Sequence, residues 1–133
     1  MSCLFCQIAE GKKKSYKVYE DEKTFAFLDV NPASKGHTLI IPKKHAGTIF
    51  DIDEKELRAV INTVKKISVS IKKSFNPKGV NIIQSNGSGA GQEIEHFHMH
   101  VVPRYDEDNI TIDFNQDPLE DPEETLELLS SHF

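Results

Sequence analysis

His96-Phe97-His98-Met99-His100-Val101-Val102 is the stretch around which this 133-residue chain is organised. Side chains alternate between the two faces of a β-strand, so the three histidines are predicted to share one face and the apolar residues the other. Imidazoles on one strand face stand about 7 Å apart, a spacing that lets several of them surround one small group. An exposed polar face is the alternative, but Ser, Thr or Lys would serve it equally well. The pattern therefore indicates a site.

The composition is that of an ordinary globular chain. The length fits one domain, and 38% hydrophobic and 28% charged residues are typical of soluble proteins. There is no apolar run of membrane-spanning length and no secretory signal pattern. With no sign of export, the two cysteines, Cys3 and Cys6, are interpreted as metal or redox ligands and not as a disulfide framework. A cytoplasmic protein without membrane association is therefore expected.

The net charge of −5 is unevenly distributed along the chain. Residues 105–133 contain ten carboxylates and no Lys or Arg, which leaves a formal charge of +5 on residues 1–104. A mildly basic body tolerates an anionic small molecule but lacks the dense basic stripe that duplex DNA requires. No nucleic-acid partner is expected, and the acidic end is interpreted as a solvated surface.

Hydrophobic periodicity predicts short strands and one long helix. Apolar residues from Leu57 to Phe75 recur at helical spacing, and Asp53 with Glu56 forms a capping-box signature, which predicts a helix over 54–75. Strands arranged in hairpins with one inserted helix favour an α+β domain, with an antiparallel sheet of about five strands, over a doubly wound sheet. The other predicted elements are a helix over 3–10, strands over 17–20, 24–30, 37–42, 79–85 and 94–102 (the last ended by Pro103), an irregular segment over 106–117 and a short helix from Pro122 to Leu129.

A glycine-rich segment, Ser85 to Gln92, directly precedes the histidine run. Glycine permits positive φ and close backbone approach, so successive N–H groups can converge on an anion. A flexible hairpin loop explains the glycines about equally well. Beside three histidines, however, a phosphate held in this loop would lie next to an imidazole. The chain has no P-loop motif, so that mode of phosphate binding is not expected.

His98 is the predicted nucleophile, because it alone has a histidine on both sides. Neutral imidazole is a competent nucleophile toward phosphorus near pH 7, since its pKa is about 6.5. A covalent phospho-imidazole intermediate would divide one hard displacement into two easier ones. The flanking histidines could then donate hydrogen bonds to non-bridging oxygens and to the leaving group.

The run from His96 to Val102 resembles the His-φ-His-φ-His-φ-φ signature of the histidine triad (HIT) superfamily of nucleotide hydrolases and transferases. The resemblance covers residues 1 to about 105 and includes Phe5–Ile8, Ala26–Asp29, Gly36–His45 and Ala90–Gln92. It implies a histidine triad domain over 1–105, followed by an acidic C-terminal extension with a short helix over 106–133. It also implies a two-fold homodimer with a continuous sheet, which would cover a sheet edge.

The resemblance assigns roles to four histidines. His98 would attack the α-phosphate of a purine nucleotide and become nucleotidylated. His100 would bind a phosphate oxygen and assist the leaving group. His96 and His37 would complete the imidazole network.

The resemblance also implies a nucleotide pocket. Phosphate would be contacted by Gln92, the backbone of Gly91 and the neighbouring Ser85 and Asn86, although Ser85 stands where many members carry Asn or Gln. Glu93 departs from one branch of the family and is expected to face solvent, because an inward carboxylate would repel phosphate. Asp29 would bind the ribose hydroxyls. The purine would lie among Phe5, Ile8, Phe27, Leu28 and Val30, for each of which plain core packing explains the residue about as well.

A possible metal site comprises Cys3, Cys6, His45 and His96, and Cys₂His₂ is a closed tetrahedral zinc set. A subset of the family with a similar Cys-x-x-Cys binds zinc at these positions, which implies a structural zinc here. Two reduced thiols at a helix start and a redox C-x-x-C are the alternatives, the latter weakened because no strand precedes the motif. No organic cofactor is expected.

The functional prediction is a nucleoside phosphoramidase that cleaves AMP-type substrates at the α-phosphate through a nucleotidyl-histidine. The alternatives are a dinucleoside polyphosphate hydrolase, a nucleotide-binding adaptor with incidental hydrolysis, and a hydrolase in which the three histidines hold a catalytic zinc. An acidic tail near the site mouth would disfavour long polyphosphates and favour a neutral or cationic leaving group.

Overall fold

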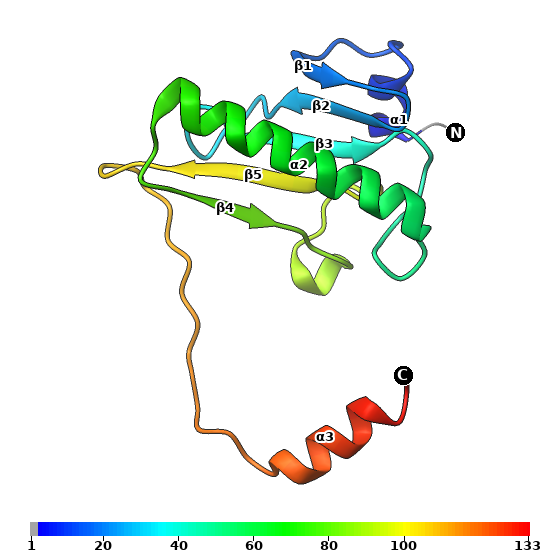
Figure 1. The fold of residues 1–133 in the computed structure, drawn as a ribbon, viewed down its shortest axis with the longest axis vertical. Helices are drawn as coiled ribbons and strands as arrows, with labels where there is room; N and C mark the ends of the chain where they lie inside the picture. Colours follow the sequence, from blue (N-terminus) through cyan, green and yellow to red (C-terminus); the bar gives the residue numbers. More distant parts are fainter. Residues whose placement is uncertain (1–2) are drawn as a thin grey trace.

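The fold is seen in a computed structural model that describes residues 3–133. Its central sheet has the strand order β1-β2-β3-β5-β4, and every neighbouring pair is antiparallel. One long helix lies across this sheet (Figure 1). The predicted α+β fold, with an antiparallel five-stranded sheet and one long helix, is thereby confirmed. The elements are α1 (Leu4–Ala9), β1 (Lys17–Glu20), β2 (Thr24–Leu28), β3 (Thr38–Pro42), α2 (Glu54–Phe75), β4 (Gly79–Ile83), the 3₁₀ turn η1 (Ser88–Ala90), β5 (Met99–Arg104) and α3 (Pro122–Ser130).

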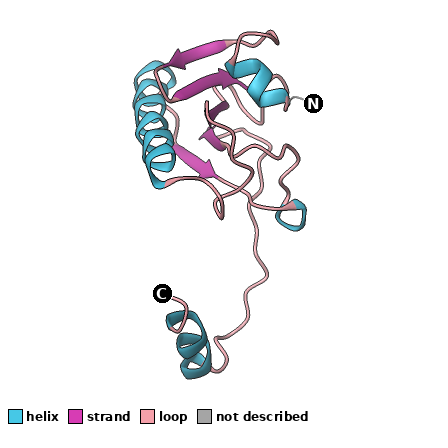
Figure 2. Cartoon of the chain, turned by 90° about the vertical axis from the view of Figure 1, so that its right-hand side faces the viewer, coloured by secondary structure: helices cyan, strands magenta, loops and turns pink. Residues whose placement is uncertain are grey.

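The central strands bury side chains on both faces of the sheet. Ala26 and Ile40 point to the face covered by α2, while their neighbours Phe25, Phe27 and Leu39 belong to a second cluster under α1. This alternation follows from the pleat of the strands. Figure 2 shows α2 on one side of the sheet and α1 on the other. Several residues of this second cluster also line the candidate site described below.

The histidine run keeps its alternation, but most of it precedes the strand. Phe97 is fully buried in the cluster under α2, and His96 and His98 contact Phe5 of α1 on the opposite face. The prediction of a strand from residue 94 is wrong, because β5 begins at Met99. The Phe97 N–H donates instead to the carbonyl of Ala46 at 2.7 Å, which takes this part of the backbone out of the β3–β5 ladder.

Pro103 lies inside β5 and does not end it, which corrects a second prediction. The last β3–β5 pair is Thr38 with Val101, so at Pro103 the strand has only β4 beside it. A missing N–H is tolerated where one side of the strand carries no ladder. The predicted strand ends at residues 30 and 85 are each two residues too late.

The helix α2 has its predicted bounds but not its predicted cap. Asp53 occupies the N-cap position without a side-chain hydrogen bond to the helix. Its carboxylate accepts from Lys44 Nζ at 2.8 Å, and Glu56 accepts from Lys23 Nζ at 3.2 Å. Two lysines brought in by the preceding chain thus replace the reciprocal capping-box contacts.

The C-terminal segment leaves the domain beside β4. Arg104 fixes its exit by donating to both carboxylate oxygens of Asp108, at 2.9 and 3.0 Å, and to the carbonyl of Ile110 at 2.9 Å. No hydrogen bond joins residues 111–133 to residues 3–110. The segment is irregular up to α3, as predicted, and α3 stands apart from the sheet (Figure 1). Within residues 3–133 the helices are all too short or too polar to cross a membrane.

Candidate active site and metal centre

A pocket of about 520 Å³ lies between α1 and the sheet face that carries the histidines. Its size is within the range of small-molecule sites. The side chains around it are mainly apolar, and His98 and His100 reach it from the histidine run. The predicted site residues that line it are Phe5, Ile8, Phe27, Leu28, Asp29, Val30, Gly91, His98 and His100.

Three predicted phosphate-binding residues, Ser85, Asn86 and Gln92, do not line this pocket. Gln92 accepts from the Gly87 N–H at 2.7 Å and donates to the Gly47 carbonyl at 2.7 Å. Asn86 accepts from a backbone N–H of the 47–51 loop, also at 2.7 Å. These amides therefore fasten the glycine-rich segment to its neighbour, and their contact with phosphate stays a prediction.

Two lysines, Lys13 and Lys14, also line the pocket and were not among the predicted site residues. The run Lys12–Lys14 directly after α1 is the signal in the sequence that could have identified them. Both are exposed and bring positive charge to a site suited to an anion. Glu93 is exposed, as expected, but it also lines the same pocket, which the expectation that it faces solvent did not include.

The ring of His98 is buried and oriented by a single backbone contact. Its Nδ1 lies 2.7 Å from the carbonyl oxygen of His96. A carbonyl only accepts, so Nδ1 carries the proton and Nε2 keeps its lone pair. Phe5 stands edge-on to the ring, with centroids 5.2 Å apart. The nitrogen left available for attack on a bound group is therefore Nε2.

His37 and His100 form a hydrogen-bonded chain with a fixed direction. The Ala33 N–H donates to His37 Nδ1 at 3.0 Å, so the proton of a neutral His37 sits on Nε2. This Nε2 lies 3.0 Å from His100 Nδ1 and 3.5 Å from a carboxylate oxygen of Asp29. His100 must then accept at Nδ1 and carry its own proton on Nε2. We call Asp29, His37 and His100 the relay group.

Burial keeps the relay group's imidazoles neutral at pH 7. It lowers the pKa of His100 to about 4, with smaller contributions from the neighbouring His98 and His37, whose rings disfavour a further positive charge beside them. Burial likewise lowers the pKa of His37, while the negative charge of Asp29 acts in the opposite direction. A neutral His100 donates a hydrogen bond through Nε2–H without titrating near physiological pH.

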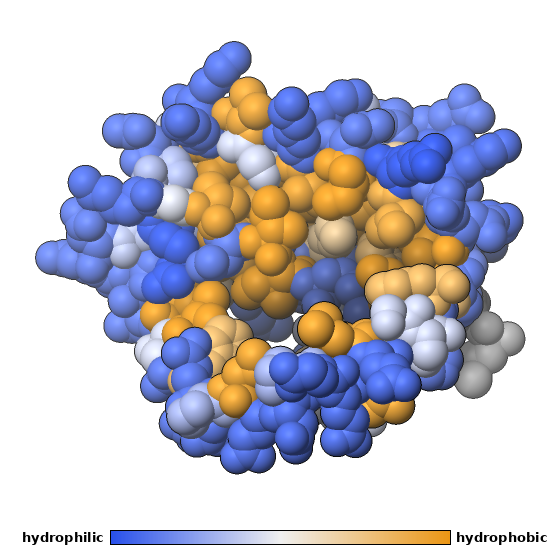
Figure 3. Space-filling view, turned by 60° about the horizontal axis from the view of Figure 1, so that its bottom comes forward, coloured by the Kyte–Doolittle hydropathy of each residue, from blue (hydrophilic) through white to orange (hydrophobic). Residues whose placement is uncertain are grey.

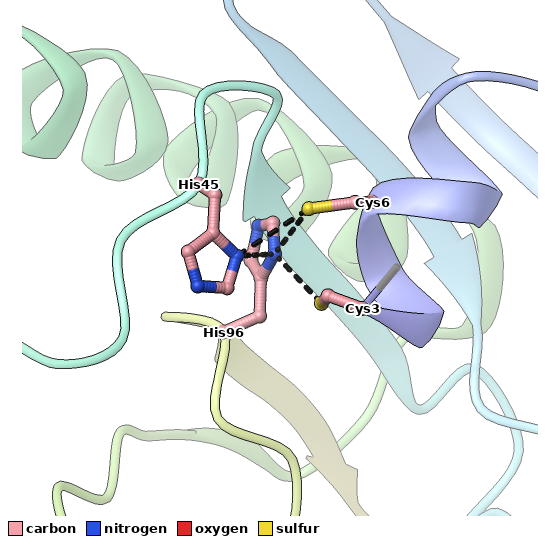
Figure 4. A group of neighbouring side chains, drawn as sticks. All are labelled: Cys3, Cys6, His45 and His96. Atoms are coloured by element: carbon pink, nitrogen blue, oxygen red, sulfur yellow. Dashed lines mark hydrogen bonds between the residues drawn. The ribbon is translucent and has the colours of Figure 1, made fainter. Parts of the chain in front are cut away.

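Cys3, Cys6, His45 and His96 converge between α1 and the histidine run, as Figure 4 shows. We call these four residues the thiol cluster. The ligand atoms all lie within 4.8 Å of one another. His96 Nδ1 is 3.3 Å from Cys3 Sγ, 3.5 Å from Cys6 Sγ and 3.1 Å from His45 Nδ1. The predicted ligand set is thus brought together from three separate parts of the chain.

The chemistry of this cluster fits a zinc ion. His96 Nε2 donates to the Pro42 carbonyl at 2.8 Å, which leaves the Nδ1 lone pair directed at the thiols. Burial lowers the pKa of His96 to about 4 and so keeps the ring in its neutral, ligating form. Burial and the neighbouring Cys3 raise the pKa of the Cys6 thiol to about 11, and a bound cation would reverse that shift.

The three histidines of the run do not share a metal. Within residues 3–133, the groups with metal-ligand spacing are the thiol cluster and the relay group. His96 belongs to the first, His100 to the second and His98 to neither. His96 does not line the pocket, and it acts on His98 through its carbonyl oxygen. A catalytic zinc held by all three histidines has no support in this geometry.

Comparisons with known proteins agree on one family. The HIT domain model matches residues 10–107. The adenosine 5'-monophosphoramidase HNT1 of Candida albicans is 38% identical over 110 residues, which cover 80% of this chain and 72% of the relative. A crystal structure of a HIT family protein from Bacillus anthracis has a TM-score of 0.90 and 41% identity, covering 98% of this chain and 93% of that one.

A Zn-bound histidine triad family protein from Mycobacterium smegmatis has a TM-score of 0.79 and 33% identity, covering 100% of this chain and 99% of that one. The family model spans most of the chain, and the relatives match it over more than two thirds of their own length. The chain therefore belongs to the HIT family.

Proposed function

We propose that this protein is a nucleotide hydrolase that cleaves adenosine phosphoramidate-type substrates at the α-phosphate through a nucleotidyl-His98 intermediate. The observation that carries the proposal is that His98 lines a pocket of small-molecule size and that the hydrogen bond of its Nδ1 leaves Nε2 unprotonated. The monophosphoramidase name of the Candida albicans relative supports the substrate class. Membership of the HIT family favours an enzymatic role for this protein over a role in binding alone.

The reaction divides into two displacements at phosphorus. His98 Nε2 attacks the α-phosphate, and the bond from phosphorus to the leaving nitrogen breaks as the amine takes a proton from water. His100 Nε2–H donates a hydrogen bond to the phosphate or the leaving nitrogen, held by His37 behind it. Water then attacks phosphorus and loses a proton, which neutralises the hydroxide left by the first step. The bond to Nε2 breaks, and AMP and free His98 result.

The His96 carbonyl has a role in both displacements. It accepts from His98 Nδ1–H at 2.7 Å in the free protein, and the same hydrogen bond would stabilise the ring when it becomes positively charged. Asp29 lines the pocket, and its carboxylate would accept from the ribose hydroxyls, while the apolar walls suit a purine.

The decisive measurement is turnover of adenosine phosphoramidate by wild type and His98→Asn. Turnover is expected to fall by about 10⁴-fold while AMP binding, measured by calorimetry, persists. His132→Asn is the matched control, since His132 lies in the tail outside the pocket. Rapid quench with labelled substrate should trap label on His98. A His98→Asn rate within tenfold of wild type, or label on Ser85 or Ser88, contradicts the mechanism.

A dinucleoside polyphosphate hydrolase is the second candidate, and Lys13 with Lys14 favours it. Their charges at the pocket suit a leaving group that is itself a phosphate. None of residues 106–133 lines the pocket, so the expected repulsion of long polyphosphates by an acidic tail at the site has no support in the described residues of one chain. The ratio of kcat/KM for the two substrate classes separates the candidates. An adaptor with incidental hydrolysis would turn over both of them slowly.

We further propose that the thiol cluster holds a structural zinc. The metal would join α1 to the loop at His45 and to the start of the histidine run, and it would supply cross-linking and not catalysis. Both cysteines are free thiols, as this role requires, which keeps the cytoplasm as the proposed compartment. The Zn-bound relative from Mycobacterium smegmatis supports the assignment.

A homodimer completes the proposal. β4 is an end strand of the sheet and exposes Ile82 and Ile83. The outer edge of an end strand, with apolar side chains beside it, is a template for pairing with a second chain. Figure 3 shows hydrophobic side chains gathered on the domain above α3, with open space between the two. We treat residues 106–133 as an extension that a second copy at this edge would contact. Sedimentation that shows only monomer at micromolar concentration would contradict the proposed homodimer.

A further inference from the structure

One short helix belongs to both sites described above. Cys3 at the N-cap of α1 and Cys6 within it contribute thiols to the thiol cluster. Phe5 and Ile8, three residues apart on the same helix, line the nucleotide pocket. A displacement of α1 would therefore change the metal ligands and the pocket wall together.

A second connection passes through the histidine run. The ring of His96 belongs to the thiol cluster, while its carbonyl oxygen accepts from His98 at 2.7 Å. Phe5 is edge-on to both rings, with centroids 6.0 Å from His96 and 5.2 Å from His98. The two sites are thus joined by direct contacts at a helix and at a backbone carbonyl.

The helix that joins them is weak by itself. α1 has six residues, and no side chain caps its N-terminus. Helices this short do not persist in water without packing or a ligand. Only Phe5 and Ile8 of α1 are buried. A metal bound by Cys3 and Cys6 would hold the first turn of α1 in place, in addition to the packing of its two buried side chains.

We propose that zinc in the thiol cluster and nucleotide in the pocket bind cooperatively, with α1 as the shared element. The inference rests on the proposed zinc site and nucleotide function, and adds a coupling between them. Zinc orders α1 and so completes the pocket wall; nucleotide packed on Phe5 and Ile8 holds Cys3 and Cys6 in place for the metal. By linkage, each ligand must tighten the other by the same factor. We expect a factor of about ten, within the usual range of coupling between two sites.

The test uses the full chain with zinc chloride and AMP as probes. Calorimetry gives the Kd of AMP for zinc-loaded and chelator-treated protein. Competition with a chromogenic chelator gives the Kd of zinc with and without saturating AMP. Two ratios of about ten that agree with each other support the proposal. Equal AMP affinities with and without zinc, in protein shown to bind both, overturn the coupling alone.

Cys6→Ser is the variant that removes a thiol and leaves the pocket lining intact. Its AMP affinity is expected to match that of chelated wild type and to ignore added zinc. Arg58→Ala, on the exposed face of α2, is the matched control and should keep the full coupling. A coupling that survives in Cys6→Ser would overturn the role of this cluster.

Chelated protein could lose AMP affinity because the whole domain unfolds and not because α1 alone is disordered. Hydrogen exchange of residues 4–9, compared with that of the sheet, distinguishes these two cases. The proposal expects fast exchange in α1 of the metal-free protein, slowed by AMP, while β2 and β3 stay protected. Uniformly fast exchange in the sheet would overturn a local role for α1. Failure of wild type to bind AMP in either form would instead reject the nucleotide function, and failure to bind zinc would reject the metal site.

Discussion

The thiol cluster and the relay group both gather histidines within 4.8 Å of other ligand-type atoms, yet they suit different chemistry. In the thiol cluster, the Pro42 carbonyl accepts from the protonated Nε2 of His96, so the lone pair on Nδ1 faces the thiols. In the relay group, the Ala33 N–H occupies the lone pair of His37 and leaves a proton facing His100. A nitrogen that carries a proton is a donor and not a metal ligand. One backbone contact on the far side of each ring therefore decides between metal binding and hydrogen-bond donation.

Zinc content is expected to differ most strongly between variants of the thiol cluster and variants of the relay group. Cys6→Ser replaces a thiolate ligand by a hydroxyl, and the apparent zinc affinity is expected to fall on the order of 10³-fold. His37→Asn, which alters the relay group alone, should keep about one equivalent per chain. Metal analysis of protein purified without chelator checks both. Less than about a tenth of an equivalent in wild type, with both thiols reactive, would reject the site.

The next effect concerns the rate of the relay group. His37→Asn removes the ring that holds His100 in its Nε2–H form, and kcat is expected to fall about 10²-fold with a smaller change in KM. Steady-state kinetics on adenosine phosphoramidate measure the split. A change confined to KM would mean that His37 shapes only the pocket.

The sequence predicted the histidines more securely than their partners. The alternation of the run and the long apolar period of α2 are local patterns, and both are seen in the structure. The contacts that orient the rings come from backbone groups of Ala33, Pro42 and His96. Every residue type offers nearly the same backbone groups, so the sequence does not indicate which of them will contact a ring. The tautomers of the histidines could therefore not be predicted.

Tertiary contacts, to backbone in one case and to a side chain in the other, explain the misplaced strand start and cap. Phe97 bonds to Ala46 and Asp53 to Lys44, and both partners are brought near only by the fold. The amides of Asn86 and Gln92 likewise bond backbone groups of neighbouring loops. A polar side chain beside glycines indicates a loop, and whether it binds loop backbone or ligand is a tertiary question.

A smaller effect concerns acid. The folded His100 has a pKa of about 4, whereas an unfolded histidine titrates near its ordinary value of 6.5. Between these two values the unfolded chain binds more protons, so the free energy of unfolding should fall as the pH is lowered through this window. Urea unfolding from pH 7 to pH 4 measures the loss, and His100→Asn should reduce the slope.

Ring NMR of His100 makes the same prediction site-specific. The negative charge of Asp29 raises the pKa of His100 against the effect of burial, so Asp29→Asn should lower it further. A measured pKa close to 6.5 in wild type would mean that the relay group is open to water and that its direction is not fixed.

The smallest expected effect comes from the acidic tail, which belongs to neither cluster. Deleting residues 111–133 keeps Asp108 and Ile110, so the contacts of Arg104 at the exit of the tail remain. The tail does not line the pocket, and charges beyond a Debye length of about 8 Å are largely screened in about 150 mM salt. We therefore expect kcat/KM for adenosine phosphoramidate to stay unchanged and that for a dinucleoside polyphosphate to rise by about twofold, because a repulsive field is removed. Repeating both measurements in about 10 mM salt should enlarge the polyphosphate effect, since the screening length grows to about 30 Å. A tenfold or larger change that persists in high salt would show that the tail contacts a pocket directly, and in a dimer that pocket would belong to the second copy.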